Sequence, residues 1–206
     1  MDVIVYGGGK FAGNIIDDFK KKINPIGYID NSGNTFLENK YGIKFLGKEI
    51  DKSMGCNDVV LCVGSEKDLF PRKRCFIKLK EMGFNMVTLI HDSSVISDRA
   101  FISEGTLVQS LCTIQSNVFV GIGGIVSANC FLGHDSMIDN FVFVGPGVNM
   151  GGSVVVGEST HIGIGATIIQ KIHVGSRCLI GASCCVIRDV PNDCRVLGVP
   201  GVISDK

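Results

Sequence analysis

From residue 96 onward the sequence follows a six-residue period that does not slip over sixteen repeats. The recurring position is aliphatic throughout, with one methionine: Ile96, Ile102, Val108, Ile114, Val120, Val126, Leu132, Ile138, Val144, Met150, Val156, Ile162, Ile168, Val174, Ile180 and Val186. If each hexad is one short strand and a corner, three hexads form a triangular coil with the aliphatic side chains stacked inward. An amphipathic helix cannot keep a period of six, and a β-sandwich would show alternation that is absent here. The period therefore predicts an all-β, left-handed parallel β-helix of about five coils.

The first part of the chain has a different pattern, in which apolar runs alternate with segments of helical spacing. We expect strands at residues 2–6 (DVIVY), at PIGYID ending in Asp30, at 58–64 and at 84–90, and a helix over 66–82 that buries Phe76 and Leu79. Strands that alternate with helices indicate a small parallel sheet of Rossmann type. The sequence thus predicts an α/β Rossmann-like domain over residues 1–92, followed by the β-helix over residues 93–206.

A glycine-rich turn follows the first expected strand. Gly7, Gly9 and Ala12 match the relaxed form G-x-G-x-x-A, and Asp30 stands at the end of the second strand, about 20 residues on. Backbone N–H groups at the start of the next helix could hold a diphosphate. A tight turn that only packs a helix on a strand would explain the same residues. About 90 residues cannot supply the second half of a dinucleotide fold, so a mononucleotide or nucleotide sugar fits better than NAD.

Composition indicates which partners, which compartment and which state of the cysteines to expect. The 20 basic and 20 acidic residues balance, which gives no electrostatic reason to expect nucleic acid or an anionic membrane as a partner. No signal peptide or membrane-span pattern is present, so we expect a cytoplasmic protein. The nine cysteines form no C-x-x-C pair and are expected to be free thiols. Four of them occupy the small-residue position of the hexads: Cys112, Cys130, Cys178 and Cys184.

The order of the domains and three segments resemble a known family. These segments are TLIHDSSVIS at the domain junction, GHDSMIDNFVFVGPGV in the middle of the repeats and DVPNDCRVLGVPG near the end. The chain resembles, over essentially its whole length, the bacterial sugar acyltransferases, among them sialic acid O-acetyltransferase and the UDP-4-amino-sugar N-acetyltransferases. The resemblance implies a homotrimer that binds acetyl-CoA as co-substrate between neighbouring prisms. It also implies that His134 is the general base and that Asp135 orients its imidazole.

The resemblance assigns further residues to the two substrates. Gly152, one coil above His134, would donate its N–H to the thioester oxygen, and the backbones of Ile164 and Ala182 would contact the pantetheine. In the N-terminal domain the acceptor nucleotide would lie near five residues: Gly7, Gly8 and Gly9 at the diphosphate, Asp30 at the base, and Gly64 lining the same pocket.

Two positions depart from the family pattern. Phe11 and Phe143 stand where the family often has histidine. Either the acceptor differs from that of the family, or other residues bind its polar groups.

His134 has two other interpretations. A zinc site needs three or four convergent ligands, but His161 is 27 residues away, which is one and a half coils, and His173 and His91 are farther still. We therefore expect no metal. A lone histidine on the surface of the prism is a second interpretation.

The sequence hypothesis is an acetyl-CoA-dependent N-acetyltransferase acting on a nucleotide-activated amino sugar, such as a 4-amino-4,6-dideoxy sugar, in surface glycan synthesis. Transfer would be direct, without an acyl-enzyme. The alternatives are an O-acetyltransferase of sialic acid or another sugar hydroxyl, and a non-catalytic β-helix scaffold.

Overall fold

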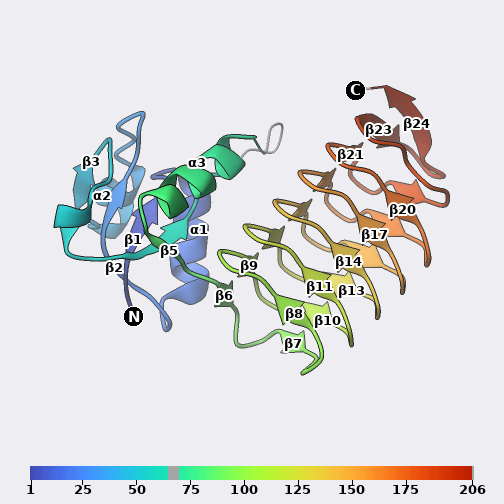
Figure 1. Cartoon of the computed structure of the whole chain (residues 1–206), viewed down its shortest axis with the longest axis horizontal. Coiled ribbons are helices and arrows are strands. Elements are labelled where there is room, and N and C mark those ends of the chain that lie inside the picture. The colour runs from blue at the N-terminus through green and yellow to red at the C-terminus, as the bar shows by residue number, and fades with distance from the viewer. Residues whose placement is uncertain (65–69, 206) are drawn as a thin grey trace. The chain divides into compact units, whose positions relative to one another are not determined.

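The computed structural model describes residues 1–64 and 70–205, which form two compact units, Met1–Val87 and Thr88–Lys206. Figure 1 shows the α/β unit in blue to green and the coiled β unit in green to red. None of the helices in the described ranges is both long and apolar enough to cross a lipid bilayer.

The first unit is a five-stranded sheet with helices. Its strands are β1 (Asp2–Tyr6), β2 (Asn24–Ile29), β3 (Phe45–Gly47), β4 (Asp58–Leu61) and β5 (Asn85–Met86). Its helices are α1 (Lys10–Phe19), α2 (Phe36–Tyr41), the 3-10 turn η1 (Lys52–Met54) and α3 (Phe70–Glu81). All strand pairs are parallel, in the order β3-β2-β1-β4-β5. Residues 3–6 of the central strand β1 form a continuous buried run, as is typical of a strand covered on both faces.

Helix α3 buries Phe76 and Leu79, as the sequence predicted. Residues 66–69 of the predicted helix lie outside the described residues. The single strand predicted over 84–90 is wrong, because the segment is divided between β5 and β6 (Leu89–Ile90).

Strand β6 pairs in parallel with β9 of the second unit. It lies six residues before β7 and so already follows the hexad period. The structure consequently divides the chain after Val87, a few residues before the boundary predicted at residue 92.

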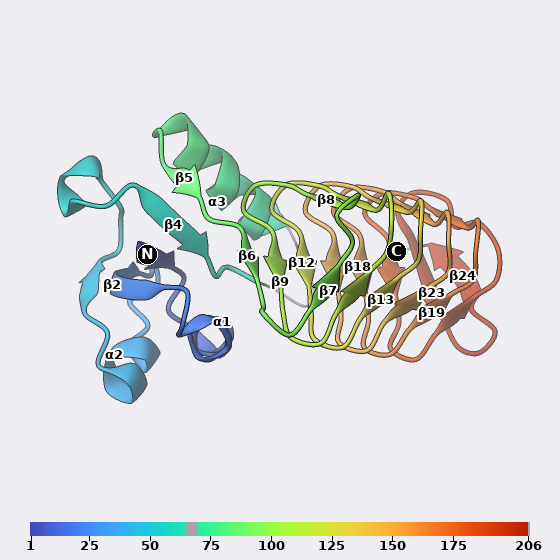
Figure 2. The ribbon, with the colours of Figure 1, turned by 90° about the horizontal axis from the view of Figure 1, so that it is seen from below.

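The second unit consists of short strands that repeat every six residues, and every third strand joins the same sheet (Figures 1 and 2). After β6 the two-residue strands are β7 (Val95–Ile96), β8 (Phe101–Ile102), β9 (Leu107–Val108), β10 (Thr113–Ile114), β11 (Phe119–Val120), β12 (Ile125–Val126), β13 (Phe131–Leu132), β14 (Met137–Ile138), β15 (Phe143–Val144), β16 (Asn149–Met150), β17 (Val155–Val156), β18 (His161–Ile162), β19 (Thr167–Ile168), β20 (His173–Val174), β21 (Leu179–Ile180) and β22 (Cys185–Val186). The three sheets are β22-β19-β16-β13-β10-β7, β20-β17-β14-β11-β8, and a third that runs from β6 to β21 and ends in β23 (Cys194–Leu197) and β24 (Val202–Asp205). The parallel β-helix predicted from the hexads is confirmed.

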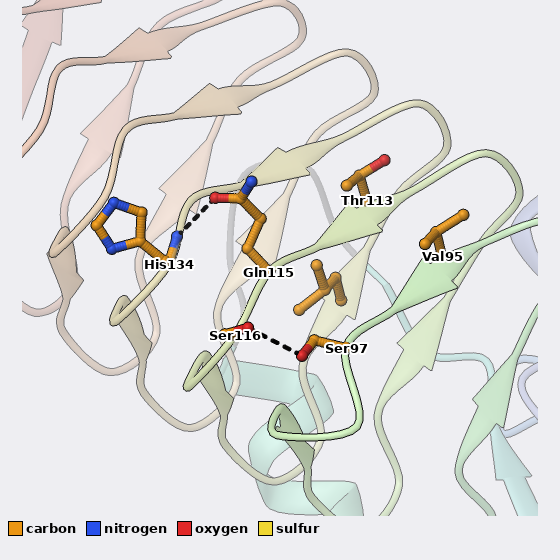
Figure 3. A pocket seen from close by; sticks show the side chains of 7 residues that line it. Val95, Ser97, Thr113, Gln115, Ser116 and His134 are labelled. Atoms are coloured by element: carbon orange, nitrogen blue, oxygen red, sulfur yellow. Dashed lines mark hydrogen bonds between the residues drawn. The ribbon is translucent and has the colours of Figure 1, made fainter.

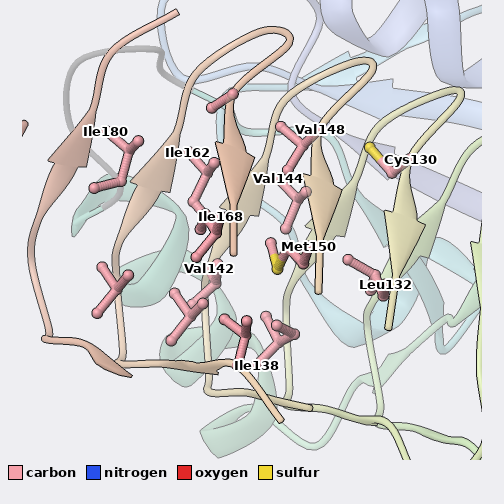
Figure 4. Packing of buried hydrophobic residues seen from close by; sticks show 14 of the residues in the cluster. Cys130, Leu132, Ile138, Val142, Val144, Val148, Met150, Ile162, Ile168 and Ile180 are labelled. Carbon is pink, nitrogen blue, oxygen red and sulfur yellow. The ribbon is translucent and has the colours of Figure 1, made fainter. Parts of the chain in front are cut away.

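The core of this unit is the stack of aliphatic side chains that the hexads predict, which we call the inner ladder. Val144, Ile162 and Ile180 are fully buried and directly paired between successive coils (Figure 4). The small-residue position is buried as well, and the free thiols of Cys112, Cys130, Cys178 and Cys184 fill it at four places. Each coil therefore supports the next through apolar contacts inside and parallel backbone pairing in the walls.

The corners between strands carry side chains that point outward. Asn117 and Asp135 stand at equivalent corner positions with φ of 60° and 59°, in the left-handed region that asparagine and aspartate tolerate better than most residues. Successive corners are joined through their backbones, as where Asp135 N–H donates to Ser116 O at 3.0 Å and Ser153 N–H donates to His134 O at 2.7 Å. Residues 18 apart in the sequence are thus stacked in columns along the prism.

Candidate active site

His134 stands at the corner that follows β13, on the outside of the β-helix. Ser116 occupies the same place one coil earlier and Gly152 one coil later. The imidazole is 61% exposed, so it is accessible to a ligand. Its backbone N–H donates to the side-chain Oε1 of Gln115 at 3.0 Å, which fixes the corner from below.

The imidazole of His134 is held by its neighbour in sequence. Nδ1 lies 2.7 Å from Oδ2 of Asp135. An ionised carboxylate only accepts hydrogen bonds, so in the neutral imidazole this contact assigns the proton to Nδ1 and leaves the lone pair on Nε2. The side-chain hydrogen bond from Asn117, followed by that from His134, lowers the pKa of Asp135. The carboxylate therefore stays ionised, and the histidine is oriented to accept a proton at Nε2.

Asn117 is a member of this site that the sequence analysis did not identify. Its Nδ2 donates to Oδ1 of Asp135 at 2.9 Å, so the two carboxylate oxygens are bonded to different partners. The signal was available in principle, because Asn117 precedes Asp135 by 18 residues, one full coil. The bond itself depends on side-chain rotamers, which the hexad pattern does not specify.

Gly152 lies directly against the imidazole. A Cβ added to Gly152 would stand 2.6 Å from Nε2 and 2.7 Å from Cε1 of His134, closer than any real Cβ contact. The absence of a side chain at this corner is thus what gives the ring its position.

The N–H of Gly152 is also open, unlike the equivalent groups of Ile122 and Ser176. Ile122 N–H donates to Asn140 Oδ1 at 3.0 Å, and Ser176 N–H donates to Asn192 Oδ1 at 2.8 Å. In the described part of the chain, Gly152 N–H has no hydrogen-bond acceptor. Gln115 caps His134 from one coil below, whereas Gly133, at the corresponding place below Gly152, has no side chain, and Gln170, one coil above, does not accept from Gly152 N–H. A free donor therefore lies beside the free lone pair of His134.

A groove of about 320 Å³ runs from His134 toward the earlier coils (Figure 3). Its lining residues come from three successive coils on the β7-β10-β13 sheet: Val95, Ser97, Thr113, Ile114, Gln115, Ser116 and His134. The groove places hydroxyl and amide groups next to the imidazole.

Ile164 and Ala182 lie elsewhere on the prism. Ile164 follows β18 and Ala182 follows β21, and both strands belong to the sheet that contains β6. His134 follows β13, which belongs to a different sheet. Both residues are exposed and stand one coil apart. A single chain therefore does not bring them to His134, although it does bring Gly152 there.

The residues predicted to bind the nucleotide gather in the first unit, around the carboxyl ends of β1, β2 and β4. Gly7 has φ of 110°, and a Cβ there would stand 2.8 Å from Cys62 O, so the chain can pass only with glycine. Gly9 is the N-cap of α1 and provides no side-chain cap for the first N–H groups of the helix. A Cβ at Gly64 would lie 3.3 Å from the ring of Phe11.

Asp30 is bonded to the glycine turn itself. Its Oδ2 accepts from Gly8 N–H at 2.7 Å, and its Oδ1 accepts from the N–H groups of Ser32 and Asn34. Burial raises the pKa of Asp30, but the hydrogen bonds from Ser32, Gly8 and Asn34 outweigh it, and the net pKa lies below its usual value. The N–H of Gly8 is thus already occupied by an anion, and the donors left at this turn are those at the start of α1.

Solved structures of bacterial sugar acetyltransferases match the chain over its whole length. A histidine-to-asparagine mutant of perosamine N-acetyltransferase from Caulobacter crescentus, in complex with CoA and GDP-perosamine, is 24% identical, with a TM-score of 0.92 over 100% of this chain and 98% of that chain. A histidine-to-alanine mutant of the same enzyme, also with CoA and GDP-perosamine, is 26% identical, with a TM-score of 0.81 over 100% of this chain and 98% of that one. The acetyltransferase domain of PglB from Neisseria gonorrhoeae is 24% identical, with a TM-score of 0.88 over 98% of both chains.

The chain has the fold of the hexapeptide-repeat sugar acetyltransferases. No protein-family model and no curated protein sequence matches it. Within this acetyltransferase fold, Phe143 stacks on His161 with ring centroids 4.6 Å apart. Of the residues that the structure describes, no three or more histidine, cysteine or acidic side chains form a group that could hold a metal ion.

Proposed function

We propose that this chain is an acetyl-CoA-dependent N-acetyltransferase that acts on a nucleotide-activated amino sugar, such as a 4-amino-4,6-dideoxy sugar. The observation that carries the proposal is the contact between His134 and Gly152, where the free Nε2 lies beside an uncapped N–H. A proton acceptor and an oxyanion donor are the two groups that acyl transfer to an amine requires. The shared fold with perosamine N-acetyltransferase supports the choice of acyl donor and acceptor class.

In the proposed reaction the acceptor amine attacks the thioester carbonyl of acetyl-CoA. His134 Nε2 takes the proton from the attacking nitrogen, and Asp135 stabilises the imidazolium that forms. The N–H of Gly152 donates to the oxyanion while the C–N bond forms and the C–S bond breaks. The proton then passes from His134 to the departing thiolate of CoA, so the enzyme returns to its starting state.

An acyl-enzyme is not part of the proposal. Burial raises the pKa of Cys178 and Cys184, and burial raises that of Cys62 to about 12, which disfavours the reactive thiolate. A hydrogen bond with Cys130 lowers the pKa of Cys112, but this thiol is 1% exposed inside the β-helix and out of reach of a thioester. The proposed transfer is therefore direct, within a complex that contains both substrates.

We assign the nucleotide of the acceptor to the first unit, as a Rossmann-like site. Its strand order, β3-β2-β1-β4-β5, and the uncapped start of α1 after Gly9 support this assignment. Because Asp30 already holds Gly8 N–H, we place the diphosphate at the start of α1, and Asp30 then maintains the shape of the turn. Ile164 and Ala182 remain proposed contacts of the pantetheine.

A homotrimer is part of the same proposal, because Ile164 and Ala182 are not brought to His134 within one chain. Phe101 and Phe119 support it, since their rings are stacked 5.7 Å apart although they are 61% and 37% exposed. An apolar ladder of this kind on an outer wall is typical of a surface covered by a partner. Light scattering coupled to gel filtration measures the assembly directly.

The alternatives are O-acetylation of a sugar hydroxyl and a scaffold without activity. A panel of UDP-, dTDP-, GDP- and CMP-linked 4-amino sugars, assayed with acetyl-CoA for release of CoA, tests the proposal. We expect turnover of one or more of these amino sugars and none of the matching 4-hydroxy sugars. Turnover of only the hydroxy sugars would establish the O-acetyltransferase, and the absence of any turnover, with no rise in melting temperature on adding acetyl-CoA, would favour the scaffold.

A further inference from the structure

Gln115 presents a hydrogen-bond donor to the groove beside His134. Its Oε1 accepts from the backbone N–H of His134 at 3.0 Å. Since an N–H must face the carbonyl oxygen of an amide, this bond fixes which end of the side chain is which. The Nε2 group therefore points away from the backbone of His134, as Figure 3 shows. In residues 1–64 and 70–205 this Nε2 has no acceptor.

The groove offers a polar rim over an apolar floor. Ser97, Thr113 and Ser116 contribute hydroxyl groups, and Oγ of Ser97 lies 3.2 Å from Oγ of Ser116. Val95 and Ile114 contribute the apolar part. A volume of about 320 Å³ lies at the lower end of the range of small-molecule sites, which suits one sugar ring better than a whole nucleotide sugar.

We propose that this groove binds the pyranose ring of the acceptor, and that Gln115 Nε2 donates a hydrogen bond to the hydroxyl next to the attacking amine. The inference rests on the proposed N-acetyltransferase function and deepens it. Gln115 and His134 belong to adjacent coils of one corner, so a ring whose amine faces His134 Nε2 brings its neighbouring substituent to the side of Gln115. The amine keeps its lone pair for the attack, and the oxygen of the hydroxyl accepts the hydrogen bond from Gln115 Nε2.

Gln115 sets specificity in a way that the serines do not. A hydroxyl group can donate or accept, so Ser97 and Ser116 can adapt to a donor or an acceptor on the sugar. The Nε2 of Gln115 only donates, and its orientation is fixed by His134. The site therefore selects an amino sugar with an oxygen acceptor beside the amine and disfavours the corresponding deoxy sugar.

The substitution Gln115→Glu separates the two roles of this side chain. A glutamate still accepts from the N–H of His134, but it has no donor for the sugar. A free hydroxyl could turn and donate to the glutamate, so the test uses the best nucleotide-linked amino sugar of the panel with its neighbouring hydroxyl methylated, because an ether oxygen only accepts. With this acceptor we expect the KM of the variant to exceed that of wild type about 3- to 10-fold, the usual contribution of one neutral hydrogen bond. The KM for acetyl-CoA and the melting temperature should not change. With the acceptor analogue that lacks the neighbouring hydroxyl, wild type and variant should have similar KM values.

Asn129→Asp is the matched control for the added charge, because Asn129 is exposed at another corner with φ of 60°. It should leave both KM values unchanged. If Gln115→Glu leaves the acceptor KM unchanged while the wild type turns over amino sugars, the inference is wrong and the proposed function stands. A rise in the KM for acetyl-CoA instead would assign the groove to the acyl donor and also overturn the inference. Failure of the wild type on every amino sugar would overturn the proposed function, and the inference with it.

Discussion

The imidazole of His134 rests on the α-carbon of Gly152, with no room for a methyl group between them. A Cβ at Gly152 would stand 2.6 Å from Nε2, the nitrogen whose lone pair is free. The same residue offers an N–H that no described residue accepts. Glycine at this corner therefore serves the site twice, through the space that it leaves and through its backbone.

Gly152→Ala should displace the imidazole of His134 without unfolding the coil. We expect kcat to fall by about 100-fold, because a shift of about 1 Å at a reacting group can have that effect. Gly124→Ala is the control, since its added Cβ meets no atom closer than 3.4 Å. Steady-state kinetics and melting curves measure both variants. Unchanged kcat in Gly152→Ala would show that the ring position is not critical.

His134→Ala removes the proposed base. We expect kcat to fall by about 10²- to 10⁴-fold, the usual contribution of a positioned general base, with little change in acetyl-CoA affinity. His173→Ala, which removes an exposed histidine at β20, should retain activity. Kinetics with acetyl-CoA and titration calorimetry test the two parts separately, and full activity of His134→Ala would eliminate the assignment.

Asn117 acts on the reaction through Asp135, so its variants should differ in their pH profiles. Asn117→Gly keeps a backbone suited to φ of 60° and removes the donor, and we expect kcat to fall about 3- to 10-fold. Asn117→Asp puts a second carboxylate beside the pair, which stabilises the protonated imidazole. On the acidic side, the activity of Asn117→Asp should therefore be lost at a higher pH than that of wild type. Profiles of kcat/KM from pH 5 to 9 that superimpose for all three proteins would exclude a positioning role.

Asp30 should make the stability of the protein depend on pH. Its pKa is lower in the folded state than in the unfolded chain, so its contribution is fully present above about pH 4 and is lost as the pH falls through the folded-state pKa. Asp30→Asn should lower the melting temperature at pH 7, and the difference from wild type should shrink below about pH 4. Thermal melts from pH 3 to 7 measure this, with the exposed Asp205→Asn as control. A difference that stays constant with pH would contradict the role of the ionised carboxylate.

Truncation should cost far more stability at one residue of β19 than at the other. Ile168 is 1% exposed in the inner ladder, and Ile168→Ala should lower the free energy of unfolding by about 2–5 kcal/mol. Its neighbour Thr167 is exposed, and Thr167→Ala should change that free energy by less than about 0.5 kcal/mol. Urea denaturation measures both changes in free energy. Similar changes for the two variants would mean that the assignment of Ile168 to the inside and Thr167 to the outside is wrong.

The hexads predicted the coils because a strict period leaves one side of each strand inside. That same arithmetic placed Gly152 over His134, since 18 residues make one coil. Leu89 and Ile90 were assigned to the wrong sheet, because a short apolar run fits either neighbour until its pairing is known. The bonds of Gln115, Asn117 and Asp30 were not predicted. Gln115 and Asp30 accept from backbone N–H groups, and Asn117 donates to the Asp135 side chain, and only the folded chain brings these groups together.

The coils are joined along the corners by main-chain hydrogen bonds, which do not depend on the side chains there. Gln115 comes from a different turn than His134 and can be exchanged while the wall remains intact. The preferred sugar can thus change by a single substitution at Gln115 without a change in the architecture.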